Sequence, residues 1–255
     1  MSRVSDHQDR MDEDRPLLTH LLELRSRLLR CAVVVLVVFL AVYPFREELY
    51  GALAGPLMAV LPEGASMIAT QVATPFLIPL KLALVAAFFV SIPYLLYQLW
   101  AFVAPGLYRH EKMLIWPLLV SSVALFYAGM AFAYYVVFPL VFSFFAAATP
   151  EGVSMMTDIG EYLSFVITLF FAFGAAFEVP IATILLVRTG ATTREALASK
   201  RPYVIVGAFT IGMVLTPPDV ISQVLLAVPV WLLFELGVIL SRWFTPNGDE
   251  AREED

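Results

Sequence analysis

Residues 114–140 read LIWPLLVSSVALFYAGMAFAYYVVFPL, a stretch without a single Asp, Glu, Lys or Arg. A helix that crosses the hydrocarbon core of a bilayer needs about 20 consecutive apolar residues, and this stretch is longer than that. The core offers no water to backbone N–H and C=O groups, so an apolar segment that crosses it has to bond internally as a helix. The stretch therefore predicts a transmembrane α-helix.

Five further apolar stretches follow the same pattern along the chain. Apolar residues make up 60% of the 255 positions and charged residues 15%, whereas soluble domains are roughly 45–50% apolar. We expect an all-α polytopic membrane protein with six transmembrane helices in residues 16–244, between a disordered tail (1–15) and an acidic tail (245–255). The expected spans are residues 28–46, 76–100, 114–140, 160–187, 202–216 and 220–240.

The first apolar stretch has an alternative interpretation as a cleaved signal peptide, because Ala52-Leu53-Ala54 resembles a small-residue cleavage site. Residues 1–30, however, carry acidic as well as basic side chains, unlike the short basic region that opens a signal peptide. We therefore retain residues 28–46 as the first membrane helix.

Basic residues set the expected orientation, since loops rich in Lys and Arg stay in the cytoplasm. Most of them precede span 1, join spans 2 and 3, join spans 4 and 5, or follow span 6. Arg46 and Lys81 are exceptions, because they flank the loop between spans 1 and 2 on the other side of the membrane. Both termini are therefore expected to be cytoplasmic (N-in/C-in) in a multi-pass protein of the inner membrane. The residues on the cytoplasmic side are Arg3, Arg10, Arg15, Arg25, Arg27, Arg30, Arg109, Lys112, Arg188, Arg194, Lys200, Arg201 and Arg242.

Two features of the C-terminal half depart from a plain bundle. The apolar part of span 5, Tyr203 to Leu215, covers only about 20 Å of a core about 30 Å thick. Either the bilayer thins there, or partner helices cover the mismatch, or spans 5 and 6 form a tight hairpin. In addition, Glu178 lies near the middle of span 4, where a charge costs about 2.5–3.5 kcal/mol. It needs a partner or a wet cavity, or it is a hydrogen-bonded structural residue next to a kink at Pro180.

Several kinds of chemistry find no support in the sequence. The three histidines, His7, His20 and His110, all fall in predicted cytoplasmic segments, and no phosphate-binding glycine loop of the Walker type is present. Asp158 and Asp219 lie at the outer ends of spans. We therefore expect no enzyme, no metal and no cofactor. The formal charge of −6 comes largely from the two tails and identifies no partner, nucleic acid included.

The segment before span 1 reads as an amphipathic helix. Pro16 suits a first helical position, and Leu17, Leu21, Leu24 and Leu28 recur at helical spacing. Interfacial helices of this kind are common, so the pattern alone does not decide a function.

A set of short motifs, in order and at similar spacing, resembles the TatC family, the multispanning core of the twin-arginine protein translocase. The resemblance covers about residues 16–244. The motifs are Thr19-His20-Leu21-Leu22-Glu23-Leu24-Arg25, Trp100-Ala101-Phe102-Val103-Ala104-Pro105-Gly106-Leu107-Tyr108 with His110-Glu111, Phe177-Glu178-Val179-Pro180, Lys200-Arg201-Pro202-Tyr203 and Leu215-Thr216-Pro217-Pro218-Asp219.

This resemblance implies a receptor for folded proteins whose signal peptides carry two consecutive arginines. Glu23 and Glu111 would bind those arginines, with Phe102 and Arg25 shaping the same surface. A guanidinium pairs with a carboxylate through two parallel hydrogen bonds, which a lysine cannot reproduce. Family members often have two basic residues after the loop glutamate, whereas Lys112 and Met113 follow Glu111 here. We expect recognition to survive this difference.

The resemblance also implies partners and a shape. Short helices 5 and 6 of a concave, glove-shaped bundle would contact the single-helix subunits TatA and TatB, and the chain would self-associate within the membrane lipid. The proton-motive force would supply the energy. The residues given roles are Met213, Thr216 and Gln223 at the partner helices, Glu178 in the concave interior, and Pro56 and Asp219 at the outer face.

Without the resemblance, a proton-coupled secondary transporter that uses Glu178 as its relay remains an alternative. Replacing Glu178 by Gln would abolish such a transporter and leave capture of arginine peptides by the cytoplasmic surface largely intact.

Overall fold

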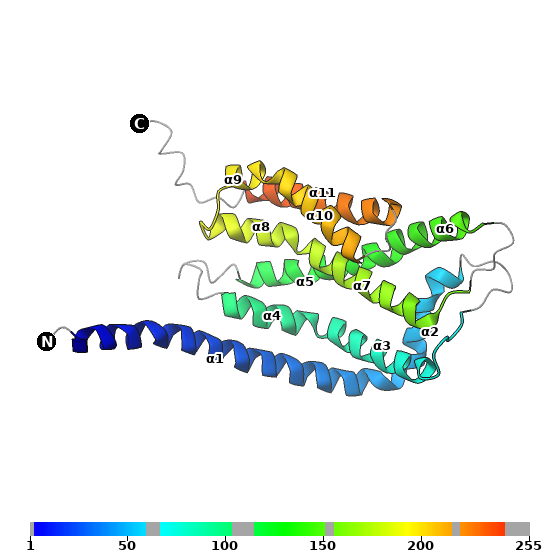
Figure 1. Cartoon of the computed structure of the whole chain (residues 1–255), viewed down its shortest axis with the longest axis horizontal. Coiled ribbons are helices and arrows are strands. Elements are labelled where there is room, and N and C mark those ends of the chain that lie inside the picture. The colour runs from blue at the N-terminus through cyan, green and yellow to red at the C-terminus, as the bar shows by residue number, and fades with distance from the viewer. Residues whose placement is uncertain (1–2, 60–66, 104–114, 151–155, 216–219, 243–255) are drawn as a thin grey trace.

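The computed structural model describes residues 3–59, 67–103, 115–150, 156–215 and 220–242 (Figure 1). Within these residues every regular element is helical, and the one β-type pairing is an isolated bridge between Ile68 and Asp158. The prediction of an all-α membrane protein is confirmed. The elements are α1 (Arg3–Val42), η1 (Tyr43–Phe45), α2 (Arg46–Met58), α3 (Thr74–Val90), α4 (Ile92–Val103), α5 (Ile115–Phe132), the π-helical turn η4 (Ala133–Val137), α6 (Phe138–Ala148), α7 (Ile159–Phe177), α8 (Val179–Arg188), α9 (Arg194–Ser199), α10 (Arg201–Leu215) and α11 (Val220–Ser241).

Several of these helices have the length and apolar composition of membrane spans. In the described part of the chain, four candidates run over Leu21–Met58, Trp116–Ala148, Ile159–Arg188 and Gln223–Ser241, and α3 with α4 makes a fifth, bent span. α10 is apolar but short, since its 15 residues cover about 22 Å. The short fifth helix and the apolar spans are as the sequence predicts. The count of six helices that cross the membrane stays a prediction.

The second span is broken, which the apolar pattern alone does not predict. α3 and α4 meet at an angle of 52° around Ser91. Pro93 lacks the N–H that would bond the carbonyl of Phe89, and the Tyr127 hydroxyl donates to that carbonyl instead, at 2.9 Å. The Ser91 hydroxyl likewise bonds the carbonyl of Ala87 at 2.7 Å. The Tyr127 hydroxyl therefore replaces the missing backbone bond, and the Ser91 hydroxyl adds a second hydrogen bond to a carbonyl that already accepts the Ser91 N–H.

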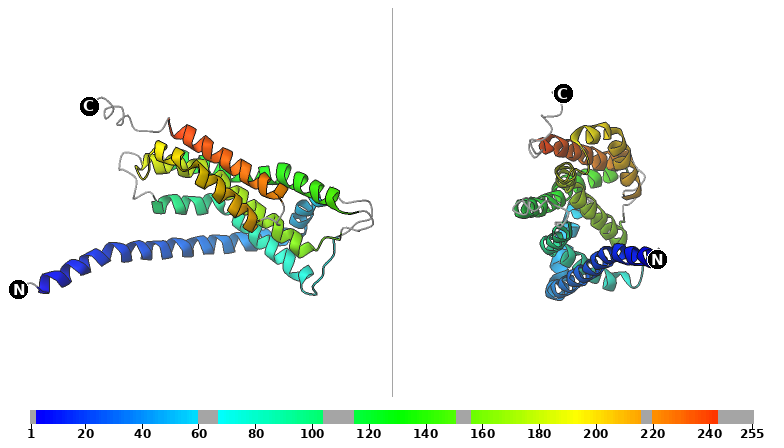
Figure 2. Two further views of the ribbon diagram at one scale, coloured as in Figure 1. Left: turned by 45° about the horizontal axis from the view of Figure 1, so that its top comes forward. Right: turned by 90° about the vertical axis from the view of Figure 1, so that its left-hand side faces the viewer.

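The helices lie along one long axis, so the bundle has two ends (Figures 1 and 2). α1 begins, α4 ends, α5 begins, α8 ends and α11 ends at one of them, which we call the termini end. α2 and the starts of α3 and α7 lie at the opposite end, the far end. α1 runs along one edge and extends beyond the other helices. It starts at Arg3, N-terminal to Pro16, and the division into tail and domain at residue 15 stays a prediction.

Close helix crossings in the bundle depend on small residues. At Gly129 of α5, an added Cβ would overlap the backbone of Phe173 on α7, and at Gly174 of α7 it would overlap the ring of Phe126. Apolar helices in lipid associate through such close packing rather than through the hydrophobic effect. Aromatic rings fill the adjoining core, where Phe138 and Phe170 lie edge to face at 5.1 Å.

The C-terminal hairpin of α10 and α11 is joined by polar groups at two levels. Arg201 donates two parallel hydrogen bonds to Glu235, from Nε to Oε1 at 2.6 Å and from Nη2 to Oε2 at 2.8 Å. Further along, the Gln223 amide donates to the carbonyl of Phe209 at 2.9 Å. α11 also packs closely on α8, where an added Cβ at Gly237 would overlap Thr183 and lie 2.9 Å from the Cα of Pro180.

The variant Gly237→Ala should therefore lower the free energy of unfolding by about 1–3 kcal/mol, because α11 has to move away from α8. Denaturation of the detergent-solubilised protein by SDS measures this. Gly207→Ala on α10 is the matched control, since a Cβ there meets nothing within 4 Å. Equal stability of the two variants would contradict the close α8–α11 crossing.

At the far end, Asp158 joins two segments. Its Oδ2 accepts hydrogen bonds from the Thr70 hydroxyl (2.6 Å) and backbone N–H (2.9 Å), and its Oδ1 caps α7 through the N–H groups of Gly160 and Glu161. The hydrogen bonds from Thr70 and from these backbone groups lower the pKa of the Asp158 carboxyl to about 2. The charged form is therefore favoured in the folded state.

A carboxyl whose pKa is lowered by folding stabilises the fold above its unfolded pKa of about 4 and ceases to do so as the pH falls through 2. We therefore expect the melting temperature of the wild type to decrease between about pH 4 and pH 2 by more than that of Asp158→Asn. Thermal unfolding in detergent at a series of pH values checks this. Parallel curves for the two proteins would exclude the proposed role of Asp158.

Candidate functional site

An ion pair at the termini end places the first predicted site residue. Glu23 on α1 accepts from Arg27 one turn later, with Nε at 3.0 Å and Nη2 at 2.6 Å from the same oxygen, Oε1. The Glu23 side chain is 37% exposed and that of Arg27 is 20% exposed. Both bonds converge on Oε1, and within the described part of the chain no donor bonds Oε2, so the partly exposed carboxylate can accept a further hydrogen bond there.

Arg27 also fastens α1 to α4. Its Nη1 donates to the Gln98 Oε1 at 2.9 Å, and its Nη2 donates to the carbonyl of Ala101 at 3.2 Å. Gln98 is buried and donates in turn to the Tyr94 hydroxyl at 2.7 Å. The guanidinium thus has acceptors on two helices, and this arrangement fixes the position of the Glu23 carboxylate at the termini end.

The structure brings the predicted site residues together in part. Phe102 follows Ala101 directly in α4, half-buried, and therefore lies beside the Arg27 contact. Arg25 is exposed and lies on a different face of α1, where it lines a groove together with Tyr94 of α4. Glu111 lies outside the described residues.

A second polar cluster lies inside the bundle around Glu178, at the junction of α7 and α8. The Ser122 hydroxyl on α5 donates to Glu178 Oε2 at 2.5 Å, and the Trp100 indole N–H on α4 donates to Ser122 at 3.3 Å. The second oxygen, Oε1, is buried and has no hydrogen-bond partner among the described residues. The same is true of the indole nitrogen of Trp231 on α11. Glu178 thus has a partner inside the protein, and the break in the helix before Pro180 agrees with the predicted kink.

The remaining predicted residues lie on the C-terminal hairpin and at the far end. Met213 on α10 is 65% exposed, whereas Gln223 is half-buried and bonds α10 itself. Pro56 lies inside α2 at the far end. Thr216 and Asp219 fall outside the described residues. The partner contacts of Met213, Thr216 and Gln223 and the outer-face role of Pro56 and Asp219 stay predictions.

Sequence reasoning missed three polar residues of these clusters, namely Arg27 as an anchor, Gln98 and Ser122. The signals were present: Glu23 and Arg27 have the i, i+4 spacing of a helical ion pair, and Gln98 and Ser122 are polar groups inside apolar spans. Among the described residues, no group of three or more His, Cys, Asp or Glu side chains is placed to hold a metal ion.

The fold and site define a multi-pass helical membrane protein with a guanidinium-binding carboxylate at one end of its bundle and a partly buried glutamate inside it. The family model of the Sec-independent protein translocase protein (TatC) matches residues 19–229. The chain belongs to the TatC family. It is therefore a component of the twin-arginine protein translocase.

Individual relatives agree with this. The TatC protein of Haemophilus influenzae is 60% identical over 241 residues, which cover 94% of each chain. That of Escherichia coli K12 is 54% identical over 243 residues, covering 95% of this chain and 94% of the relative. A crystal structure of the twin-arginine translocase receptor TatC has 38% sequence identity and a TM-score of 0.80, covering 89% of this chain and all of that one.

The anchoring role of Arg27 predicts the effect of Arg27→Gln. The change removes the contacts with Glu23, Gln98 and Ala101, and leaving buried acceptors unpaired costs about 1–3 kcal/mol. Residues 21–30 of α1 should then exchange amide hydrogens about tenfold faster, as measured by mass spectrometry. Arg25→Gln removes the same charge from an exposed side chain and serves as the control. Equal exchange in both variants would show that Arg27 does not anchor α1.

Proposed function

We propose that this chain is the core receptor subunit of the twin-arginine translocase. It binds the signal peptides of folded proteins and nucleates assembly with TatA and TatB for export driven by the proton-motive force. The observation that carries the proposal is the Glu23 carboxylate, which already binds a guanidinium at the termini end. At the same end, α8 ends at Arg188, and α9 and α10 begin at Arg194 and Arg201.

The chemistry of Glu23 suits an arginine ligand. The carboxylate is partly exposed and held in place through Arg27, so little side-chain freedom is lost when a ligand binds. An incoming guanidinium donates to Oε2, and Glu111 supplies the second carboxylate that a pair of arginines needs. Charge-assisted hydrogen bonds of this kind contribute about 1.5–3 kcal/mol each.

The orientation follows from the same basic residues. Arg194, Lys200 and Arg201 lie at the termini end, whereas Arg46 and Lys81 lie towards the far end. By the positive-inside rule, the termini end faces the cytoplasm, which is where folded cargo is presented. Both termini are then cytoplasmic and the membrane is the inner membrane.

The α10–α11 hairpin is the surface that suits a single-helix partner such as TatA or TatB. Val206, Ile211 and Met213 of α10 are 65%, 55% and 65% exposed. α10 is too short to cross an undisturbed bilayer, so a partner helix packed on it would cover the mismatch. Met213 and Gln223 belong to this hairpin, and Thr216 directly follows α10 in the sequence.

The test is capture of a twin-arginine signal peptide by the protein in lipid nanodiscs. Glu23→Gln and Glu111→Gln should each weaken binding about 10–100-fold, because each removes a charge-assisted pair. Glu195→Gln is the matched control, since it removes an acidic side chain from α9 at the same end. Photocrosslinks from positions 23, 102 and 111 should disappear with a twin-lysine peptide.

Two outcomes would count against the proposal. Equal capture of twin-arginine and twin-lysine peptides would reduce the termini end to a non-specific charged surface. Unchanged affinity in both glutamate variants would place the binding site elsewhere.

A further inference from the structure

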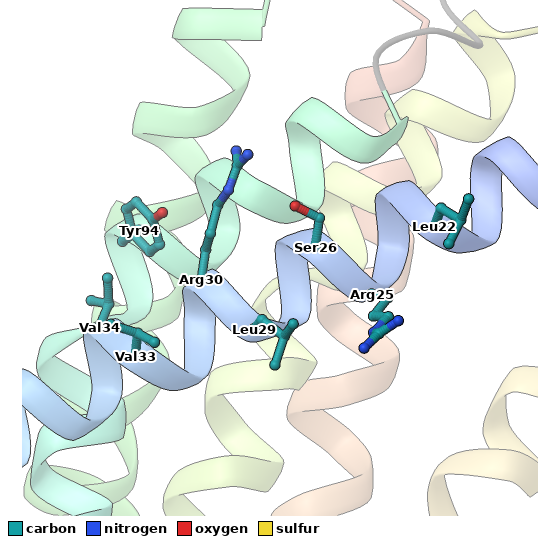
Figure 3. A pocket seen from close by; sticks show the side chains of 8 residues that line it. All are labelled: Leu22, Arg25, Ser26, Leu29, Arg30, Val33, Val34 and Tyr94. Atoms are coloured by element: carbon teal, nitrogen blue, oxygen red, sulfur yellow. The ribbon is translucent and has the colours of Figure 1, made fainter.

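A groove on α1 is separate from the Glu23–Arg27 pair. It has a volume of about 580 Å³ and follows one face of α1, with Tyr94 of α4 beside it (Figure 3). Its polar lining is Arg25, Ser26, Arg30 and Tyr94, and its apolar lining includes Leu29 and Val33. These α1 positions recur at helical spacing, so the groove is continuous along the helix.

The positive charge of the groove favours an anionic ligand. Two guanidiniums line it, and none of its lining residues is acidic. Figure 3 shows Arg30 and Ser26 on the side of α1 that faces Tyr94, and Arg25 on the opposite side of the helix. The Tyr94 hydroxyl accepts from Gln98, so its own proton is available to donate. A peptide that carries arginines would be repelled here, so the groove is distinct from the proposed Glu23 and Glu111 site. Arg25, which the resemblance assigned to the signal-peptide surface, is assigned to this groove instead.

The depth of the groove matches a lipid headgroup. Arg25 and Arg30 are about 7.5 Å apart along the helix axis, and the headgroup layer on each side of a bilayer is about 5–7 Å thick. Further along α1 in the direction of the far end, Val33, Leu36 and Val37 are 56–61% exposed and apolar. With the termini end at the membrane surface, the basic rim would lie among headgroups and the apolar floor would continue among acyl chains.

We propose that this groove binds an anionic phospholipid of the leaflet at the termini end. Arg30, Ser26 and Tyr94 donate to the phosphate, Arg25 adds a second positive charge across the groove, and an acyl chain lies along Leu29 and Val33. The apolar floor adds no binding energy for a free phosphate ion, which has no acyl chain. The second positive charge favours a headgroup with a net negative charge over a zwitterionic headgroup.

The full-length protein is purified from nanodiscs that contain equal amounts of phosphatidylglycerol and phosphatidylcholine, and retained lipid is identified by native mass spectrometry. The wild type should retain phosphatidylglycerol preferentially. Arg30→Gln should weaken its retention about tenfold, and Tyr94→Phe should weaken it to a smaller extent. Arg194→Gln removes one charge from α9 at the same end and should retain lipid as the wild type does.

Arg30→Lys keeps the positive charge, so partial retention in that variant is the expected result. Equal retention of the two lipids by the wild type, or identical retention by Arg30→Gln and Arg194→Gln, would overturn the proposal. Displacement of the lipid by millimolar inorganic phosphate would also overturn it, because the site would then be a simple anion site. No signal peptide is present, so the result is independent of the proposed receptor function.

Discussion

A backbone inside hydrocarbon has to satisfy its own hydrogen bonds, and the rest of this structure depends on how the chain meets that constraint. Proline residues interrupt its helices, and the freed carbonyl of Phe89 is bonded by the Tyr127 hydroxyl from a neighbouring helix. Glycines at the helix crossings then let backbones approach closely enough for such contacts. The bends are therefore fixed by tertiary contacts and not by local flexibility.

Polar side chains are placed under the same constraint, and the last turn of α4 connects both polar clusters. Its Trp100 indole bonds Ser122, which bonds Glu178, while the carbonyl of Ala101 accepts from Arg27, the partner of Glu23. Two consecutive residues thus contact the cluster inside the bundle and the carboxylate at the termini end. A displacement of this turn would change the hydrogen bonds of both the Glu178 cluster and the Glu23–Arg27 pair.

The fold was largely predictable from sequence, because long apolar runs in a membrane protein permit few alternatives to helices. The 52° bend between α3 and α4 was not, since Pro93 marks a possible break but the hydroxyl that stabilises it comes from Tyr127, far away in sequence. Glu23 was predicted as a site residue from the family resemblance, and Glu178 from its depth in span 4 as well as from the resemblance. Their partners Arg27, Gln98 and Ser122 were missed, because which polar groups meet across helices depends on helix rotation, which an apolar pattern does not define.

The Glu23 carboxylate holds a guanidinium before any ligand arrives. That guanidinium belongs to Arg27, which also donates to the Gln98 side chain and the Ala101 carbonyl. Arg27 therefore keeps two acceptors if its bond to Glu23 breaks. In the proposed receptor, a second guanidinium on Oε2 would therefore share a carboxylate whose charge Arg27 already balances in part. A shared carboxylate attracts each guanidinium less than an unshared one, so such a site would hold an arginine-bearing partner and still let it go.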